Sequence, residues 1–542
     1  SFEALSEKDF QNIKRIIDDE IPILKPNSPR KHQEKALNLI LDHFEKNKRG
    51  QLIHACGTGK TLTSYLVFKK IKPKLTLYLV PSLQLINQTL IEWSKESLAN
   101  RAPISPLVIC SDVSNERISE HDPQLWIQDL GIKVSNDFGD VQKFLNSKRK
   151  NKVIFSTYHS SKILAKHLVK LEKTIDLAFF DEAHNTVSSK EKMFSYLLFD
   201  KNIKIKKRLF MTATPKKLIG NNDRFLSMDD VEIYGTVIDE ITVKDAIEDL
   251  NILNDYKIIT QLVGNKKVRS LLKSNPFVVD EQRLPEKVEL KLISSAITLK
   301  KIIKEKKLNN VVSFHSRVNR AKVFQVGINN IKKRQPINAF HVHGKQSGTV
   351  RNKILSDFVN QTPSLITNAR CLSEGVNVPS IDAVMFVDPK QSKVDITQAI
   401  GRALRKGKKV KGDSFIIVPI AIDPKDISSI DEAYQQILMV LRSMSEHDGR
   451  IVEYFKLVTE GKNPSKKFLE IETEYLIEKF DLSQFSKSLH TKAWSRFAKL
   501  GRRPFMQARE WARALGINSS EWREFAKTKN KPIDIPADPP KA

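Results

Sequence analysis

Cysteine is scarce in this sequence: 542 residues contain only Cys56, Cys110 and Cys371. Three cysteines without a C-x-x-C pair cannot form the disulfide framework of a small secreted domain, and they do not match the spacing of a structural zinc site. The scarcity therefore predicts a reduced, cytoplasmic environment.

Long hydrophobic runs are also missing. The apolar stretch FIIVPIAI, residues 415–422, has the length of a strand and is too short to span a bilayer. No secretory signal pattern opens the chain, so we expect no membrane partner. The chain begins with Ser1 rather than Met, and it could be a fragment of a longer protein.

Acidic residues are outnumbered by basic ones. The 63 Asp and Glu residues face 91 Lys and Arg residues, which leaves a formal net charge of +28. Such an excess favours a polyanionic partner such as nucleic acid. The alternative is a lysine-rich surface that only keeps the protein in solution.

What the sequence does contain is a repeated alternation of short apolar runs and longer amphipathic segments. Continuous apolar runs between helical patterns indicate parallel sheets that are buried on both faces. One series extends from about residue 50 to 215 and a second from about 311, and the β signals stop after about 421. We expect an α/β fold with two tandem parallel-sheet domains and a C-terminal helical accessory region. The predicted boundaries are an N-terminal helical segment at 1–28, a first domain at 29–215, a connecting segment at 216–290, a second domain at 291–420 and the helical region at 421–542.

The stretch HACGTGKT, residues 54–61, lies between an apolar strand and a helical pattern, as a phosphate-binding loop does. His54 stands where the usual pattern has glycine. The loop residues Gly57, Thr58 and Gly59 would turn backbone N–H groups toward phosphate oxygens. Lys60 would reach the β and γ phosphates, and the Thr61 hydroxyl would bind Mg²⁺. A chance match in a loop is the alternative.

The acidic pair in DEAH, residues 181–184, follows the apolar run LAFF and should lie at a strand end. Asp181 would hold Mg²⁺, and Glu182 would orient and deprotonate the attacking water. Neighbouring buried carboxylates are costly without a cation, which argues against a surface turn. This pair makes ATP hydrolysis the leading hypothesis.

The stretch QAIGRALR, residues 398–405, places Gln398, Arg402 and Arg405 at helical spacing. Guanidinium groups can neutralise the charge that develops on the γ phosphate, as an arginine finger does. Two arginines at this spacing are otherwise common on a solvated helix face.

Taken in order, these motifs resemble those of superfamily 2 helicases and translocases, whose fold is two RecA-like domains. The resemblance covers roughly residues 29–420, and it also takes in VPSLQLINQT, FSTYHS, MTATP and VVSFHSR. It implies ATP and Mg²⁺ as cofactors, Gln33 of RKHQ as an adenine contact, and Gly375 and Asn377 of NARCLSEGVNVPSID as nucleotide contacts. Asn377 departs from the Asp that is common at its position.

A narrower resemblance is to helicases associated with restriction-modification systems and mobile elements, including the motor of single-chain type I-like restriction enzymes. It rests on VICSDVS, YGTVIDEITVKDAIED and VDITQAIGRALRKGK. It implies a DNA helicase or double-stranded DNA translocase of bacterial, phage or mobile-element origin, with a nuclear or viral origin as alternatives. The expected partner is duplex or forked DNA, with RNA as a second candidate. The alternative function is a non-motor DNA- or protein-binding regulatory subunit of a restriction, defence or mobile-element replication complex.

The same resemblance assigns further residues near strand ends. The nucleic-acid contacts it implies have loop capping as their alternative role; they are Ser82, Gln84, Thr157, His159, Ser316 and Arg317. Thr212 and Thr214 would couple the ATP state to the grip on nucleic acid. His341 and His343 alternate along an expected strand, but no third metal ligand lies nearby in the sequence.

The C-terminal tail contains a faint repeat, with AWSRFAK at 493–499 echoed by EWREFAK at 521–527. The spacing predicts a small helical module with a tryptophan-centred core, and base stacking by the tryptophans is the alternative. The tail resembles a short repeat found beside viral, phage and helicase-like proteins. A DNA-binding or protein-docking role for this region is the expectation.

Overall fold

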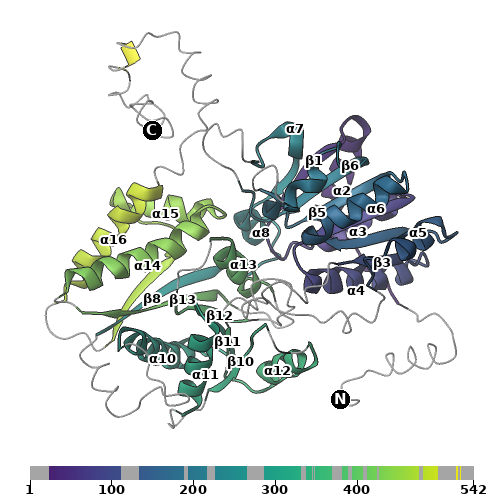
Figure 1. Cartoon of the computed structure of the whole chain (residues 1–542). Helices are drawn as coiled ribbons and strands as arrows, with labels where there is room; N and C mark the ends of the chain where they lie inside the picture. The colour runs from purple at the N-terminus through teal and green to yellow at the C-terminus, as the bar shows by residue number, and fades with distance from the viewer. Residues whose placement is uncertain are drawn as a thin grey trace. The chain divides into compact units, whose positions relative to one another are not determined.

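The structure is a computed structural model, and two parallel β-sheets dominate it (Figure 1). It describes residues 24–110, 134–187, 193–216, 226–264, 286–330, 337–344, 346, 348–368, 381–388, 393–406, 412–423, 426–474, 480–497, 521–522 and 525. Each sheet has seven strands and flanking helices, which confirms the predicted pair of RecA-like α/β folds with a helical C-terminal region. None of the described helices is long and apolar enough to cross a membrane.

The first sheet has the strand order β3-β4-β2-β5-β6-β1-β7. Its strands pair in parallel and run between these bounds: β1 Arg49–His54, β2 Leu75–Val80, β3 Ser105–Ile109, β4 Lys152–Thr157, β5 Ile175–Asp181, β6 Ile205–Thr212 and β7 Thr236–Ile241. Because the strands are parallel, their carboxyl ends share one edge, where ligands bind in such sheets.

Helices cover both faces of this sheet, as the continuous apolar strands predict. In β2, Leu75, Leu77 and Leu79 pack on one face, while Tyr78 and Val80 pack on the other. The Tyr78 face is covered by α2 (Lys31–Lys46), α3 (Lys60–Ile71) and α4 (Leu83–Ala99). The opposite face is covered by α5 (Phe138–Asn146), α6 (Ser161–Lys170) and the 3₁₀ turn η6 (Met193–Leu198). Three further short elements are η4 (Tyr158–Ser160), η5 (Ala183–Thr186) and α7 (Val231–Tyr234).

The second sheet has the strand order β10-β11-β9-β12-β13-β8-β14. Its strands are β8 Tyr256–Gly264, β9 Asn310–Phe314, β10 Asn338–His341, β11 Ser364–Asn368, β12 Ala383–Phe386, β13 Ser414–Ile422 and β14 Leu469–Glu474. The helices that follow the first sheet along the chain are α8 Val243–Glu248, α10 Glu286–Lys306, α11 Val318–Asn330, α12 Gly348–Asn360, α13 Lys393–Ala403, α14 Ile427–Ser445, α15 Gly449–Thr459 and α16 Leu482–Phe497.

The expectation that β structure stops after residue 421 is wrong. Strand β14 pairs in parallel with β8, from Leu469 opposite Ile258 to Glu474 opposite Val263. Its sequence LEIETE alternates apolar and charged residues, and such a short amphipathic run needs a partner strand to be stable. The stretch DEAYQQILMVLRSMSEHDGRIVEYF, residues 431–455, has a helical pattern throughout but forms two helices, α14 and α15, and Asp448 caps the second. The first copy of the tail repeat lies mainly in α16 (Leu482–Phe497), where Ala493 and Phe497 are buried, and residues 498–520 lie outside the described residues.

The stretch 216–290, expected as a connection, supplies one strand to each sheet. Strand β7 pairs with β1 of the first sheet, and β8 pairs with β14 of the second. Between them, Thr242 caps α8 with a capping box formed with Asp245.

Candidate functional site

The loop between β1 and α3 has the backbone of a phosphate-binding loop. Gly57 has φ of +88° and Gly59 has φ of +87°, a left-handed conformation in which side chains are strained. Gly59 also stands at the N-terminus of α3, where the helix dipole favours an anion. A Cβ at Gly59 would lie 2.5 Å from Nε2 of Gln33, so the loop also needs glycine for space.

Of the polar side chains of the loop, Lys60 and Thr61 line a cavity, whereas Thr58 bonds to the loop itself. The Lys60 ammonium donates to the His54 carbonyl oxygen at 2.9 Å. The Thr58 hydroxyl donates to the Ala55 carbonyl at 2.8 Å, and its side chain is buried. Thr58 therefore stabilises the loop from within.

Gln33, expected as an adenine contact, is buried against the phosphate loop. Its Nε2 donates to the Gly59 carbonyl at 3.2 Å, and its Oε1 accepts from the Arg30 backbone N–H at 2.9 Å. His32 contacts the Thr58 carbonyl at 2.9 Å. Helix α2 therefore holds the loop in place through two neighbouring side chains, and Gln33 does not line the cavity.

The acidic pair lies at the carboxyl end of β5. Asp181 accepts from the Tyr78 hydroxyl at 3.2 Å and from the Glu182 backbone N–H at 3.0 Å. Burial, reinforced by the charge of Glu182, raises the pKa of Asp181 to about 6. Burial also raises the pKa of Glu182, although Lys60 and Arg402 oppose that shift. A buried and a partly buried carboxylate side by side are suited to a divalent cation, which would stabilise their charged forms.

Helix α13 carries Gln398 and Arg402, whereas Arg405, expected on the same helix, lies two residues beyond its end and bridges to Leu253. Gln398 is 5% exposed, and its Oε1 has no hydrogen-bond partner among the described residues. Such an orphaned buried acceptor is available to a bound water or ligand. Arg402 and Arg405 both line the same cavity as Gln398, but only Arg402 does so from the helix.

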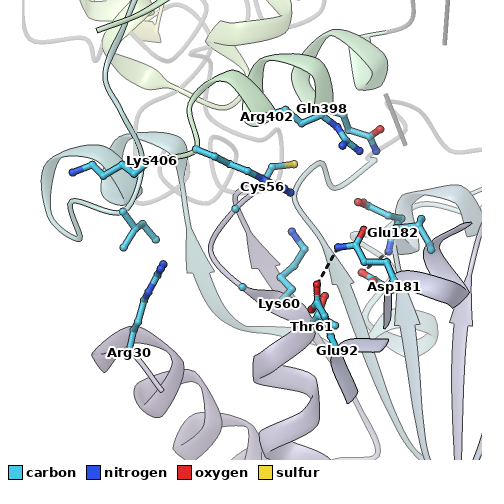
Figure 2. A pocket seen from close by; sticks show the side chains of 16 residues that line it. Arg30, Cys56, Lys60, Thr61, Glu92, Asp181, Glu182, Gln398, Arg402 and Lys406 are labelled. Atoms are coloured by element: carbon cyan, nitrogen blue, oxygen red, sulfur yellow. Dashed lines mark hydrogen bonds between the residues drawn. The ribbon is translucent and has the colours of Figure 1, made fainter. Parts of the chain in front are cut away.

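These groups surround one cavity of about 360 Å³, a size typical of small-ligand sites. Figure 2 shows Lys60 directed toward the helix that carries Gln398 and Arg402, with Asp181 and Glu182 to one side. The cavity is lined by Arg30, Cys56, Gly57, Gly59, Lys60, Thr61, Leu85, Gln88, Glu92, Asp181, Glu182, Ile252, Gln398, Arg402, Arg405 and Lys406.

Seven of these lining residues were missed from the sequence: Arg30, Cys56, Leu85, Gln88, Glu92, Ile252 and Lys406. One available signal was the i, i+3, i+7 spacing of Leu85, Gln88 and Glu92, which places them on one face of α4. Gln88 donates to Glu92 at 3.2 Å, and burial raises the pKa of Glu92. Ile252 lies between α8 and β8, outside both elements.

The two threonines expected to couple the site to nucleic acid both contact His184 of the DEAH stretch. Nδ1 of His184 lies 2.9 Å from the Thr212 hydroxyl and 3.2 Å from the Thr214 hydroxyl. The same nitrogen is 3.5 Å from a carboxylate oxygen of Glu182. His184, to which no role was assigned from the sequence, therefore links β6 to the acidic pair.

The six expected nucleic-acid contacts differ in their exposure. Ser82 caps α4 by accepting from the Leu85 N–H, and Gln84 is buried and accepts from Arg351 at 3.2 Å. The Thr157 and Ser160 hydroxyls lie 3.1 Å apart in the interior. The Ser316 hydroxyl donates to Asp388 at 3.0 Å.

His159 and Arg317 are the two of the six that are exposed. The His159 ring stands edge-on to Phe194, with 4.6 Å between ring centroids. Gly375 and Asn377, the expected nucleotide contacts of the second half, lie outside the described residues.

The two histidines of HVH lie with their ring centroids 5.5 Å apart. Nδ1 of His341 lies 3.0 Å from the Thr367 hydroxyl. Among the described residues, no group of three or more His, Cys, Asp or Glu side chains is arranged to hold a metal ion.

Two family models match the chain. The model described as type III restriction enzyme, res subunit, matches residues 27–217, and the helicase conserved C-terminal domain matches residues 294–407. A probable helicase of African swine fever virus is 25% identical over 427 residues in a Kenyan pig isolate and 26% identical in a Malawian tick isolate. Each alignment covers 78% of this chain and 44% of the viral protein, so the chain spans less than half of these relatives.

Two solved structures share the fold. The ATP-dependent type ISP restriction-modification enzyme LlaBIII, bound to DNA, superposes with a TM-score of 0.71 at 24% identity, over 93% of this chain and 36% of that one. A nuclease-deletion mutant of the type ISP enzyme LlaGI, in complex with a DNA substrate mimic, gives a TM-score of 0.60 at 22% identity, over 92% and 33%.

Proposed function

Because this chain belongs to the superfamily 2 helicases of the restriction-enzyme type, we propose that it is an ATP-driven motor that moves along DNA. The observation that carries the proposal is the single cavity described above. It brings together side chains from three separate stretches of the sequence, the phosphate loop at 57–61, the acidic pair at 181–182 and the stretch 398–405.

Each group around the cavity has a role in cleaving a phosphoanhydride. Lys60 would exchange the His54 carbonyl for the β and γ phosphates of ATP, and Gly57 and Gly59 would present backbone N–H groups to them. Glu182 would accept a proton from the attacking water. Arg402 and Arg405 would neutralise the charge that builds on the γ phosphate.

The residues present fit a magnesium ion. Thr61 and Asp181 would hold it, with phosphate oxygens and waters completing the shell, because Mg²⁺ prefers few protein ligands. The ion would supply charge neutralisation of the β and γ phosphates. The raised pKa of Asp181 is consistent with a site that a cation completes.

DNA is the proposed track for two reasons. The net charge of +28 suits a polyanion, and two structural relatives are described in complex with DNA or with its mimic. Phosphate contacts from the exposed His159 and Arg317 would position the strand without reading its sequence. ATP hydrolysis would be coupled to this grip through Thr212 and Thr214.

The test is the ATPase rate of the purified chain, measured alone and with single-stranded DNA, duplex DNA, forked DNA and RNA. Stimulation by a DNA substrate is expected, and it should weaken as salt is raised because phosphate contacts release counterions. If RNA stimulates the ATPase and no DNA substrate does, RNA would be the track instead of DNA. Lys60→Ala should remove the activity. If no nucleic acid stimulates hydrolysis and Lys60→Ala changes nothing, the motor proposal fails and a non-motor binding subunit is the better description.

A second measurement distinguishes a motor that translocates along duplex DNA from one that unwinds it. Displacement of a third strand from a triplex without separation of the duplex would indicate translocation, whereas release of a strand from a forked duplex would indicate unwinding.

A further inference from the structure

His54 is the last residue of β1 and occupies the loop position that is usually glycine. Its imidazole is 1% exposed, and its Nε2 lies 2.8 Å from Oδ2 of Asp239 in β7. The other carboxylate oxygen of Asp239 accepts from the Lys35 ammonium of α2 at 3.0 Å. A glycine at position 54 could not make the contact with Asp239, so the histidine adds a specific connection that the usual loop lacks.

The hydrogen bond between His54 and Asp239 has a defined direction. A carboxylate oxygen can only accept, so the imidazole Nε2–H donates. Burial lowers the pKa of His54, with Lys60 and His32 acting in the same direction and Asp239 opposing. Burial alone would raise the pKa of Asp239, but hydrogen bonds from His54 and Lys35 hold it below its ordinary value. The pair is therefore a neutral imidazole that donates to a buried carboxylate, which is a charge-assisted bond.

On the side of the phosphate loop, His54 also contacts Lys60 through its backbone. The His54 carbonyl accepts from Lys60 Nζ at 2.9 Å. The next residue, Ala55, donates its N–H to the Ile241 carbonyl of β7 at 2.9 Å. Strand β7 therefore holds the start of the phosphate loop through one side-chain bond and one backbone bond.

After β7, the chain continues through the capped helix α8 to a segment that contacts the residues just after α13. In this segment, Asn254 donates its N–H to the Leu404 carbonyl at 2.7 Å. Leu253 forms an antiparallel bridge with Arg405. A Cβ at Gly57 would lie 3.1 Å from Cδ2 of Leu253, so this segment also packs against the loop.

We propose that His54 and Asp239 are positioning residues that fasten the phosphate loop to the β7–α8 segment, so that the loop and Arg405 move as one unit when nucleotide binds. The inference rests on the proposed ATPase function for its kinetic consequences. The fastening itself does not depend on that function. Lys35 is two-thirds exposed and acts only by neutralising the outer carboxylate oxygen.

The kinetic test compares variants that differ only in the donor. His54→Gln places an amide N–H where Nε2 is, and it loses nothing at Nδ1, which has no hydrogen-bond partner among the described residues. His54→Leu fills the space without a donor. We expect DNA-stimulated kcat to stay within about twofold in His54→Gln and to fall about tenfold in His54→Leu, with KM for ATP changing less in both.

The carboxylate side is tested by Asp239→Asn, which should lower kcat, and by the double variant with His54→Leu, which should be no worse than His54→Leu alone. The control is Glu240→Gln, a neighbouring exposed acid in the same strand. Equal loss in His54→Gln and His54→Leu, or additive losses in the double variant, would show that the pair does not act through its hydrogen bond.

Hydrogen exchange on the nucleotide-free chain gives a readout that does not require ATPase activity. In His54→Leu, amide exchange should rise in peptides from both 55–61 and 242–254, and in His54→Gln it should not. A rise confined to the loop would overturn the connection to the Arg405 segment, even if hydrolysis is normal. If the unmodified chain does not hydrolyse ATP, the proposed function fails. The exchange result would still show whether His54 and Asp239 fasten the phosphate loop to the β7–α8 segment.

Discussion

Gly401 of α13 lies directly against Cys56 of the phosphate loop. A Cβ added at Gly401 would come within 2.6 Å of the Cys56 Cβ and 3.4 Å of its Sγ. Burial raises the pKa of the Cys56 thiol, so this side chain is a neutral packing surface for the helix. The arginine-bearing helix can approach the loop this closely only because position 401 has no side chain.

The first prediction follows from that contact. Alanine favours a helix over glycine by about 1 kcal/mol, which offsets part of the cost of the overlap with Cys56, so Gly401→Ala should change stability little while lowering ATPase kcat/KM about tenfold. Gly412→Ala is the control, because a Cβ there would meet nothing within 4 Å. Adding Cys56→Gly should restore part of the lost activity. Full activity in Gly401→Ala would show that α13 need not approach the loop this closely during turnover.

The second prediction concerns the proposed base. Glu182→Gln keeps the size of the side chain but cannot take a proton, so turnover should fall about 100-fold or more while ATP binding persists. Equilibrium binding of ATP and single-turnover hydrolysis measure the two effects separately. Glu45→Gln, an exposed acid of α2, is the matched control. Normal turnover in Glu182→Gln would assign the base to another residue.

The third prediction tests the threonine contacts to His184. Valine has the shape of threonine without the hydroxyl, so Thr212→Val with Thr214→Val should remove both contacts to Nδ1 and leave the packing intact. DNA stimulation of the ATPase is expected to drop severalfold, with a smaller change in the basal rate, because the link to the acidic pair is lost. Thr76→Val serves as the control, since that buried strand hydroxyl has no hydrogen-bond partner among the described residues. An equal drop in basal and stimulated rates would argue against a coupling role.

The fourth prediction is a pH dependence of stability. Burial, with His343 nearby, lowers the pKa of His341 from 6.5 to about 4. Because the unfolded chain takes up this proton more readily than the folded one, the stabilisation is complete above pH 6.5 and is lost as the pH falls toward 4. His341→Asn keeps a polar group near Thr367 but does not titrate, so it should lose less stability between pH 7 and pH 5, by on the order of 1 kcal/mol.

Thermal unfolding at both pH values measures this difference. His159→Asn, at an exposed histidine, should behave like the unmodified chain. An identical loss of stability in His341→Asn and the unmodified chain would mean that another group controls the acid response.

The parts of the fold that could be predicted are those determined by local patterns. Continuous apolar runs such as LTLYLV are buried on both faces, as parallel strands require, and Gly57 and Gly59 have the positive φ that their loop motif implies. Ser82 and Gln84 show where such inference stops. Ser82 caps α4, which was the alternative role considered for it, whereas the partner of Gln84 is Arg351, 267 positions away, which the sequence around Gln84 does not reveal.

The cavity lining could be predicted only in part for the same reason. Lys60 and Asp181 belong to short motifs with a known chemistry. Glu92 and Ile252 reach the same space from positions outside any of the motifs, and only the assembled chain brings them there. Strand β14 escaped prediction because its pairing with β8 joins residues about 200 positions apart.

The pairing of β8 with β14 has a practical consequence for shortened versions of the chain. Both strands belong to the same compact unit, and β14 occupies the outer position of the second sheet. A chain ended near residue 421, where the sequence suggested a boundary, would leave the nine-residue apolar strand β8 as an uncovered edge. Uncovered apolar edges pair with other chains and aggregate. A soluble, shortened motor should therefore retain residues through Glu474.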